Sequence, residues 1–167
     1  MTASGARMQS RQGYGAEHEV RRISFSTLEL DPAFGRLVAE YGEECQIRGL
    51  PPVRPQPDIY RLLDASGVME TFGAYIGAEM VGFLILLLSV APHYGETLAM
   101  TESLYLRPEF RSTGIGGDLL ELVERRAAER GAIGILVSAP LGGRLAEVLP
   151  TRGYVKTNEI FFCAVRQ

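Results

Sequence analysis

The chain contains one continuous apolar segment, Val81–Leu88, which constrains the fold more than any other part of the sequence. It is less than half as long as the roughly 20 residues that a helix needs to cross a membrane, so we interpret it as a buried strand. Because the segment is apolar on both faces, we expect the strand to lie in the middle of a sheet, with helices on both sides. A chain of 167 residues is long enough for one such domain with a substantial core.

Composition and charge argue against several classes of protein. Hydrophobic residues make up 46% of the chain and charged residues 22%, which argues against global disorder. The formal net charge of −3 gives no reason to expect binding to nucleic acid. The N-terminal arginines are not followed by an apolar core, so neither a secretory signal nor a membrane partner is predicted.

The cysteines and histidines favour a cytoplasmic protein without a bound metal. Cys45 and Cys163 are too few and too far apart for a disulfide framework, and reduced thiols are typical of the cytoplasm. His18 and His93 lack the spacing of metal ligands, so no metal site is predicted.

The spacing of apolar residues predicts a mixed α/β order, with early antiparallel strands and a late strand-helix-strand unit. Residues 1–18 are predicted to form a flexible tail, and residues 19–167 the domain. The predicted strands are Val20–Ser26, Thr71–Ile76, Met80–Val90, Leu98–Leu106, Ile133–Ser138 and Glu159–Val165. The predicted helices begin near Asp31, Asp58, Ile115 and Leu141, and Gly131 is expected to end the third of them.

A glycine-rich junction, Arg111–Gly117, lies between a predicted strand and a predicted helix. Backbone N–H groups at such a junction, together with the helix N-terminus, favour binding of phosphate or pyrophosphate, and Arg111 would add a positive charge at the rim. A P-loop would require Lys-Ser/Thr where the chain has Gly117-Asp118. A dinucleotide motif would require its third glycine at Leu119, and it would lie early in the chain. The pattern Arg/Gln-x-x-Gly-x-Gly/Ala fits.

The segment Ser103–Gly116, which ends in Arg-Ser-Thr-Gly-Ile-Gly, resembles the acetyl-CoA signature of the GNAT family of N-acetyltransferases. The resemblance extends from about Val20 to Val165 in element order, and the family's late Gly-Phe/Tyr pair is present as Gly153-Tyr154. It implies the acyl-CoA N-acyltransferase fold, which is a mixed, mostly antiparallel central sheet of about six or seven strands flanked by helices on both faces.

The same resemblance implies how the coenzyme is held. Backbone amides of the glycine-rich junction would bind the pyrophosphate, and the free edge of the preceding strand would pair with the pantetheine arm. A serine at the end of the next strand would reach the thioester region. The residues assigned to coenzyme binding are Leu104, Tyr105, Leu106, Arg111, Ser112, Thr113, Gly114, Ile115, Gly116, Gly117 and Ser138.

The reaction of this family is the direct attack of an amine on the acetyl thioester, so a base must take the proton of the amine. Glu102 is predicted to be that base. In a regular strand it shares a face with the apolar residues at the even positions of Leu98–Leu106, and such surroundings would raise the pKa of its carboxyl. The alternatives are a bulge that turns Glu102 to solvent, or a simple ion pair with an arginine.

Other positions of the family pattern are less defined. Many members have a tyrosine as general acid four residues before the Gly-Phe/Tyr pair, where this chain has Leu149, so no general acid is assigned. His93 and Tyr94 are candidates for lining the acceptor pocket, with a surface turn as the alternative. The proline-rich part of Tyr41–Ala65 is either a rigid lip of that pocket, with Tyr60 and Arg48 or Arg54 as contacts, or a solvated loop.

The prediction is therefore an acetyl-CoA-dependent N-acetyltransferase that acts on a primary amine of a small molecule or a peptide. The alternatives are a non-catalytic acyl-CoA-binding sensor or regulatory module, and an enzyme that transfers a longer acyl group. A homodimer is compatible with the apolar run Ile160-Phe161-Phe162, which equally suits an internal strand.

Overall fold

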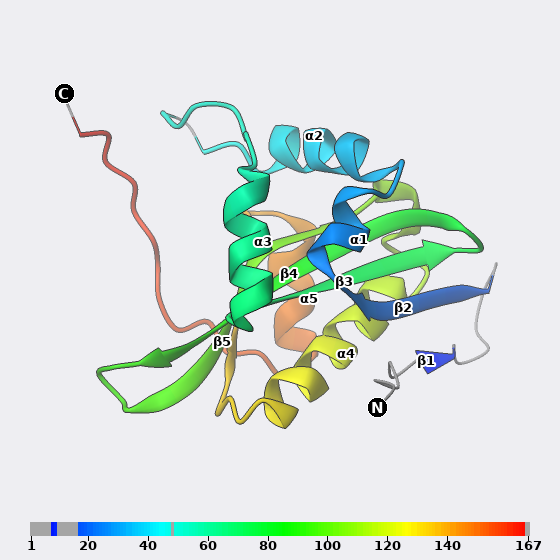
Figure 1. Cartoon of the computed structure of the whole chain (residues 1–167). Coiled ribbons are helices and arrows are strands. Elements are labelled where there is room, and N and C mark those ends of the chain that lie inside the picture. Colours follow the sequence, from blue (N-terminus) through cyan, green and yellow to red (C-terminus); the bar gives the residue numbers. More distant parts are fainter. Residues whose placement is uncertain (1–7, 10–16, 48, 166–167) are drawn as a thin grey trace.

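The computed structural model describes residues 8–9, 17–47 and 49–165, whose helices and strands are shown in Figure 1. Within these ranges six strands form one sheet in the order β1-β2-β3-β4-β5-β6, and all neighbours are antiparallel except β5 and β6. The strands are β1 Met8–Gln9, β2 His18–Ile23, β3 Met69–Ile76, β4 Glu79–Ala91, β5 Glu96–Leu106 and β6 Ile135–Leu136. The helices are α1 Phe25–Glu29, α2 Phe34–Glu44, α3 Pro57–Ser66, α4 Ile115–Glu129 and α5 Arg144–Thr151, with a 3₁₀ turn η1 at Pro108–Phe110. The mixed, mostly antiparallel fold class is confirmed.

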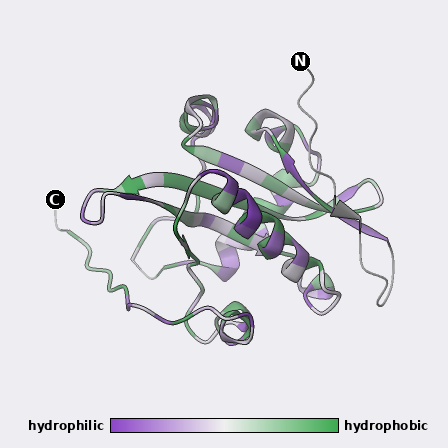
Figure 2. Ribbon diagram, turned by 90° about the horizontal axis from the view of Figure 1, so that it is seen from below, coloured by the Kyte–Doolittle hydropathy of each residue, from purple (hydrophilic) through white to green (hydrophobic). Residues whose placement is uncertain are grey.

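The apolar run lies in the central strand β4, as predicted, because β4 pairs with β3 on one side and with β5 on the other. Alternate residues of a strand point to opposite faces of the sheet. Leu84 and Leu86 pack against α4 in one core cluster, whereas Phe83 and Ile85 pack against α1 and α2 in the other. In Figure 2, which views the molecule from below, the hydrophilic outer side of α4 lies in front of the apolar strands. None of the helices in the described ranges is long and apolar enough to span a membrane.

The first predicted strand is shorter than expected, because residues Phe25–Glu29 form the helix α1. The hydroxyl oxygen of Ser24 caps this helix by accepting a hydrogen bond of 3.1 Å from the amide of Thr27. Phe25 and Leu28 are both buried, and their spacing of three places them on one face of a helix. The alternation seen in the sequence therefore ends at Ile23 rather than at Ser26.

The prediction of a strand at Glu159–Val165 is wrong. Residues 154–165 have no regular secondary structure, and Ile160 and Phe161 are 84% and 86% exposed. The predicted strand Ile133–Ser138 is reduced to the two residues of β6. A run of apolar residues forms a strand only where a neighbouring strand supplies hydrogen-bond partners, and in the described structure no strand lies beside Glu159–Val165.

The predicted N-terminal tail is only partly described. Residues 1–7 and 10–16 lie outside the described residues. Met8–Gln9 form β1 and pair with Val20 and Glu19 of β2. His18, assigned to the tail, is the first residue of β2, and its Nε2 lies 2.7 Å from a carboxylate oxygen of Asp118 in α4.

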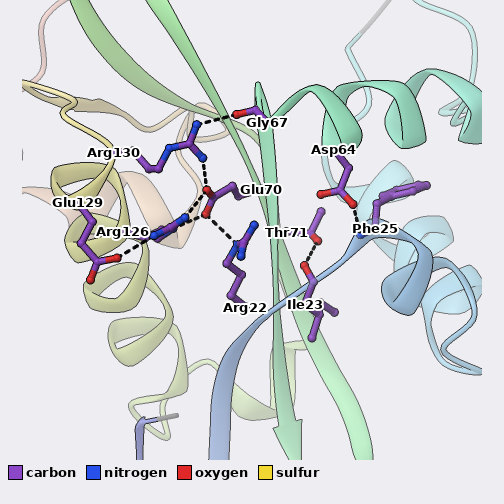
Figure 3. Close-up of polar contacts among 10 residues, drawn as sticks. All are labelled: Arg22, Ile23, Phe25, Asp64, Gly67, Glu70, Thr71, Arg126, Glu129 and Arg130. Carbon is purple, nitrogen blue, oxygen red and sulfur yellow. Dashed lines mark hydrogen bonds and ion pairs between the residues drawn. The ribbon is translucent and has the colours of Figure 1, made fainter. Parts of the chain in front are cut away.

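One carboxylate, that of Glu70 in β3, is completely buried between the sheet and α4 (Figure 3). Arg126 donates two hydrogen bonds to it, at 2.6 and 2.9 Å, and Arg22 of β2 lies 3.0 Å away. Arg130 contacts the same carboxylate and also donates to the carbonyl oxygen of Gly67. This cluster ties the C-terminal end of α4 to β2, β3 and the end of α3.

Gly82 lies where the backbone of β5 comes close to β4, and we expect its replacement by alanine to destabilise the fold. A Cβ atom at this position would lie 2.6 Å from the carbonyl oxygen of Tyr105, so the two strands would have to shift. We expect Gly82→Ala to lose about 1–3 kcal/mol of unfolding free energy, measured by urea denaturation. Gly35→Ala in α2 is the control, because a Cβ atom added there would meet no atom within 4 Å. This substitution should be neutral or stabilising. Equal stability of Gly82→Ala and the wild type would contradict the close approach.

Candidate active site

The predicted base, Glu102, lies at a bulge in β5. Ile85 of β4 pairs with Ser103, whereas the next residue, Leu86, pairs with Thr101, so Glu102 is an extra residue without a partner on β4. The bulge places Glu102 beside Ser103 in the wall of one cavity, on the side of the sheet covered by α1 to α3.

The bulge corrects the predicted surroundings of Glu102. Leu104 and Leu106 belong to the core cluster on the α4 side, so Glu102 does not share a face with them. The carboxylate is exposed, as the bulge alternative expected, but it also lines the cavity.

The cavity has a volume of about 180 Å³. Most of its wall is apolar, and five aromatic rings contribute to it: Phe25, Phe34, Tyr41, Tyr60 and Phe83. Residues 53–55 of the proline-rich segment form another part of the wall and include Arg54. The segment therefore does line the cavity, and Arg48, the other arginine considered, lies outside the described residues.

Tyr60 holds the carboxylate of Glu102 in place. Its hydroxyl donates a hydrogen bond of 2.8 Å to Oε1 of Glu102, and its ring stacks on Phe25 with centroids 4.9 Å apart. Burial, and then the hydrogen bond to the Glu102 carboxylate, raise the pKa of the Tyr60 hydroxyl. Burial and the nearby Cys45 and Glu102 groups raise the pKa of Tyr41 to about 12. Both phenols are therefore neutral at physiological pH, and Glu102 is the one carboxylate among the residues that line the cavity.

Ser103, next to Glu102, was not predicted as a site residue. Its side-chain oxygen is buried and has no hydrogen-bond partner among the described residues. Buried hydroxyls nearly always have a partner, so this unpartnered oxygen in the wall of the cavity is an exception that needs an explanation. A regular strand would have pointed Ser103 and Glu102 to opposite faces, so the sequence carried no signal for their proximity.

The glycine-rich junction forms an open turn before α4. Gly114, with a φ of 95°, is the N-cap residue, and a Cβ atom there would meet no atom within 4 Å. The backbone N–H groups of Ser112, Gly114, Ile115 and Gly116 have no hydrogen-bond acceptor within the described part of the chain. Free donors at a helix N-terminus are the kind of group that binds anions, so the turn has the geometry that the predicted pyrophosphate site requires.

Arg111 and its neighbours differ from the expected arrangement. Arg111 Nε donates to the carbonyl oxygen of Leu106 at 2.7 Å, and its Nη2 contacts the carboxylate of Glu44 in α2. Its guanidinium therefore joins the turn to β5 and α2 rather than standing as a free charge. Thr113 donates through its hydroxyl to the carbonyl oxygen of Phe110, and the carbonyl oxygen of Gly117 accepts from Arg152.

The edge of β5 opposite β4 is open near its C-terminal end. Strand β6 pairs with β5 only at Ala99 and Met100, and the amide of Ser138 then donates to the Thr101 hydroxyl. From Glu102 to Leu106 no strand of the described structure covers this edge. The structure thus brings together the predicted coenzyme residues Leu104, Tyr105, Leu106 and Ser138, the glycine-rich turn and Glu102.

His93 and Tyr94 are not part of this constellation. They lie in the turn of the β4–β5 hairpin, at the opposite end of β5 from Leu106, where Tyr94 is 70% exposed. Figure 1 shows this hairpin projecting away from α2, and neither residue lines the cavity.

Two tyrosines that could replace the missing general acid, Tyr154 and Tyr105, are each hydrogen-bonded to a carboxylate. Tyr154 donates to Glu124 at 2.7 Å, and Tyr105 donates to Glu40 at 3.0 Å. Leu149, at the family's usual tyrosine position, is buried.

Comparisons with known proteins identify the family and the fold. The sequence model of the acetyltransferase (GNAT) family matches residues 38–141 of the chain. Among curated proteins, none has a matching sequence.

Several solved structures share the fold at low sequence identity. An aminoglycoside acetyltransferase from an uncultured soil metagenomic sample, meta-AAC0020, aligns with a TM-score of 0.70 and 16% identity, over 89% of this chain and 97% of that chain. A second aminoglycoside acetyltransferase from an uncultured soil metagenomic sample, HMB0005, aligns with a TM-score of 0.69 and 22% identity, over 90% of this chain and 99% of that chain. The ribosomal-protein-alanine N-acetyltransferase of Brucella melitensis biovar Abortus 2308 aligns with a TM-score of 0.66 and 18% identity, over 90% and 99%. The family match covers more than half of the sequence, and the chain therefore belongs to the acetyltransferase (GNAT) family.

Proposed function

We propose that this acetyltransferase moves the acetyl group of acetyl-CoA directly to a primary amine. The observation that carries the proposal is the placement of Glu102 beside the open edge of β5, which ends near a turn of free backbone N–H groups. Proteins with similar structures include an aminoglycoside acetyltransferase and a ribosomal-protein-alanine N-acetyltransferase, which is consistent with an amine acceptor.

The residues around the turn fit a coenzyme that carries a pyrophosphate. The N–H groups of Ser112, Gly114, Ile115 and Gly116 supply donors without acceptors in the described structure, and the side of Gly114 that a Cβ would occupy is open. The backbone of Leu104–Leu106 supplies an edge that an extended ligand can pair with, as an added strand would. When bound, acetyl-CoA supplies an acetyl group activated as a thioester.

Glu102 supplies the base for the transfer. The amine nitrogen forms a bond to the carbonyl carbon, the carbon–sulfur bond breaks, and the proton of the amine passes to the Glu102 carboxylate, directly or through one water. The thiol is released with a proton taken from solvent. A thiol with a pKa near about 8.5 leaves readily, so the reaction does not depend on a protein acid.

Binding of the coenzyme is testable by thermal unfolding. Acetyl-CoA at 100 times its dissociation constant is expected to stabilise the wild-type protein by about 2.7 kcal/mol. The double variant Gly114→Asp/Gly116→Asp should show no rise in unfolding temperature with acetyl-CoA, because two carboxylates would then face the pyrophosphate. Gly95→Asp is the matched control: Gly95 also has a positive φ and open space around it, but it lies in the distant hairpin turn. It should keep the full shift.

Thermal unfolding, together with an assay of coenzyme A thiol release, separates the alternatives. Absence of a shift in the wild type would reject coenzyme binding and with it the proposed function. A shift without release of coenzyme A thiol across a broad panel of amines would support a non-catalytic acyl-CoA-binding protein instead.

A further inference from the structure

The walls of the cavity beside Glu102 suit an apolar group. The aromatic rings pack edge to face around it. The ring centroids of Phe34 and Phe83 are 5.4 Å apart with an angle of 77° between the ring planes, and those of Tyr41 and Phe83 are 6.1 Å apart with an angle of 70°. Such walls gain free energy by removing apolar surface from water, and they favour planar groups that stack or meet them edge to face.

The size of the cavity limits what it can hold. A cavity of roughly 150 Å³ lined by apolar side chains holds one benzene ring. At about 180 Å³, the cavity of this protein is large enough for one ring with a short chain, or for an aliphatic group of similar size. Glu102, which lines the cavity, is exposed to solvent.

Two polar groups with unused capacity lie together in this wall. The Glu102 carboxylate accepts one hydrogen bond from Tyr60, and a carboxylate can accept several more. Ser103 is only 5% exposed, and its side-chain oxygen has no hydrogen-bond partner in the described structure. A single amino group that donates to both atoms would satisfy the hydroxyl and place the nitrogen next to the base.

The same wall disfavours amines that carry many polar groups. Every hydroxyl or second ammonium group placed against the rings would lose its hydrogen bonds to water without gaining a partner. Arg54, which also lines the cavity, adds a positive charge that opposes a second ammonium group.

We propose that the acceptor is a primary amine on a compact aromatic or aliphatic body, best represented by an arylalkylamine, whose nitrogen is bound between Glu102 and Ser103. This inference rests on the proposed function, because it assigns the acceptor of that reaction. It sets the chain apart from the aminoglycoside acetyltransferases that share its fold.

The substrate class is tested by the initial rate of coenzyme A thiol release from acetyl-CoA with three acceptors. These are 2-phenylethylamine, the aminoglycoside sisomicin and a short peptide with an N-terminal alanine. We expect kcat/KM for 2-phenylethylamine to exceed that for either other acceptor by at least about tenfold, which corresponds to about 1.4 kcal/mol. A higher value for sisomicin or the peptide would overturn the inference and leave the proposed function intact. Failure to acetylate 2-phenylethylamine, although acetyl-CoA stabilises the protein, would also overturn it. Failure to bind acetyl-CoA would overturn both.

The position of the amine is tested by Ser103→Ala. Because the hydroxyl has no internal partner, its removal should leave the unfolding temperature unchanged or raise it slightly. The KM for 2-phenylethylamine should nevertheless rise by about tenfold, since one hydrogen bond to the substrate is lost. Ser89→Ala, on an exposed position of β4 outside the cavity, is the matched control and should keep the wild-type KM. An unchanged KM in Ser103→Ala would contradict the placement of the nitrogen at Ser103.

Discussion

Replacement of Glu102 by glutamine is expected to lower kcat by about 100-fold or more at neutral pH, because a positioned base contributes about 10²–10⁴ to a reaction of this kind. The amide has the shape of the carboxylate and can still accept the hydrogen bond from Tyr60, but it cannot take a proton from the amine. The measurement is kcat for wild type and variant with saturating acetyl-CoA and an amine that the wild type acetylates.

Tyr60→Phe is the matched control for this prediction. It removes the hydroxyl that orients Glu102 but leaves the carboxylate in place, so kcat should fall by less than about tenfold, the equivalent of one net hydrogen bond. Both variants should unfold at nearly the wild-type temperature, because Glu102 is exposed. If Glu102→Gln keeps the wild-type kcat at every pH tested, Glu102 is not the base.

Replacement of Glu70 by alanine is expected to have the largest effect on stability, a loss of about 3–5 kcal/mol in the free energy of unfolding. The substitution leaves Arg22, Arg126 and Arg130 close together without the carboxylate that they share. Their side chains are 28% to 51% exposed and can turn toward water, so we expect the lower end of that range. Urea denaturation measures the loss.

A second glutamate of this region serves as the control. Glu121→Ala removes a carboxylate from the exposed side of α4 and should change the free energy by no more than about 0.5 kcal/mol. A loss in Glu70→Ala no larger than that in Glu121→Ala would show that the buried cluster contributes little.

The Glu70 cluster also predicts how stability depends on pH. Burial alone would raise the pKa of Glu70, but the hydrogen bonds from Arg126 and Arg130 and the charge of Arg22 lower it below its ordinary value of 4.5. The stability that this group contributes is therefore fully present above the unfolded-state pKa and is lost as the pH falls through the folded-state pKa. Wild-type stability should decrease below pH 4.5, whereas Glu70→Gln should show a flatter profile in that window. Urea midpoints at a series of pH values test this, and parallel profiles would contradict it.

Much of the fold could be predicted because its local signals agree with its tertiary contacts. The run Val81–Leu88 is apolar on both faces and lies between two helical layers. Helix α4 begins after Gly114 and ends before Gly131, two glycines with positive φ, so its predicted bounds are nearly those observed. The segment Glu159–Val165 has the composition of a strand, but no strand of the described structure lies beside it.

The site was predictable only where it depends on local sequence. The glycine-rich turn before α4 is such a case. The surroundings of Glu102 depend instead on how β5 aligns with β4, and a shift of one residue between Ile85 and Leu86 is not visible in either strand alone. Ser103 was missed for the same reason.

The buried Glu70 cluster has a consequence for the opposite end of α4. The arginines that fix this helix come from its last turns, and the free N–H groups lie before and within its first turn, roughly 18 Å along the helix axis at 1.5 Å per residue. A helix of this length is a stiff rod, so fastening one end inside the core also fixes where the other end points. The free N–H donors of the turn are therefore preorganised, and an anion that binds there, as we propose for the coenzyme pyrophosphate, would lose little affinity to ordering the protein.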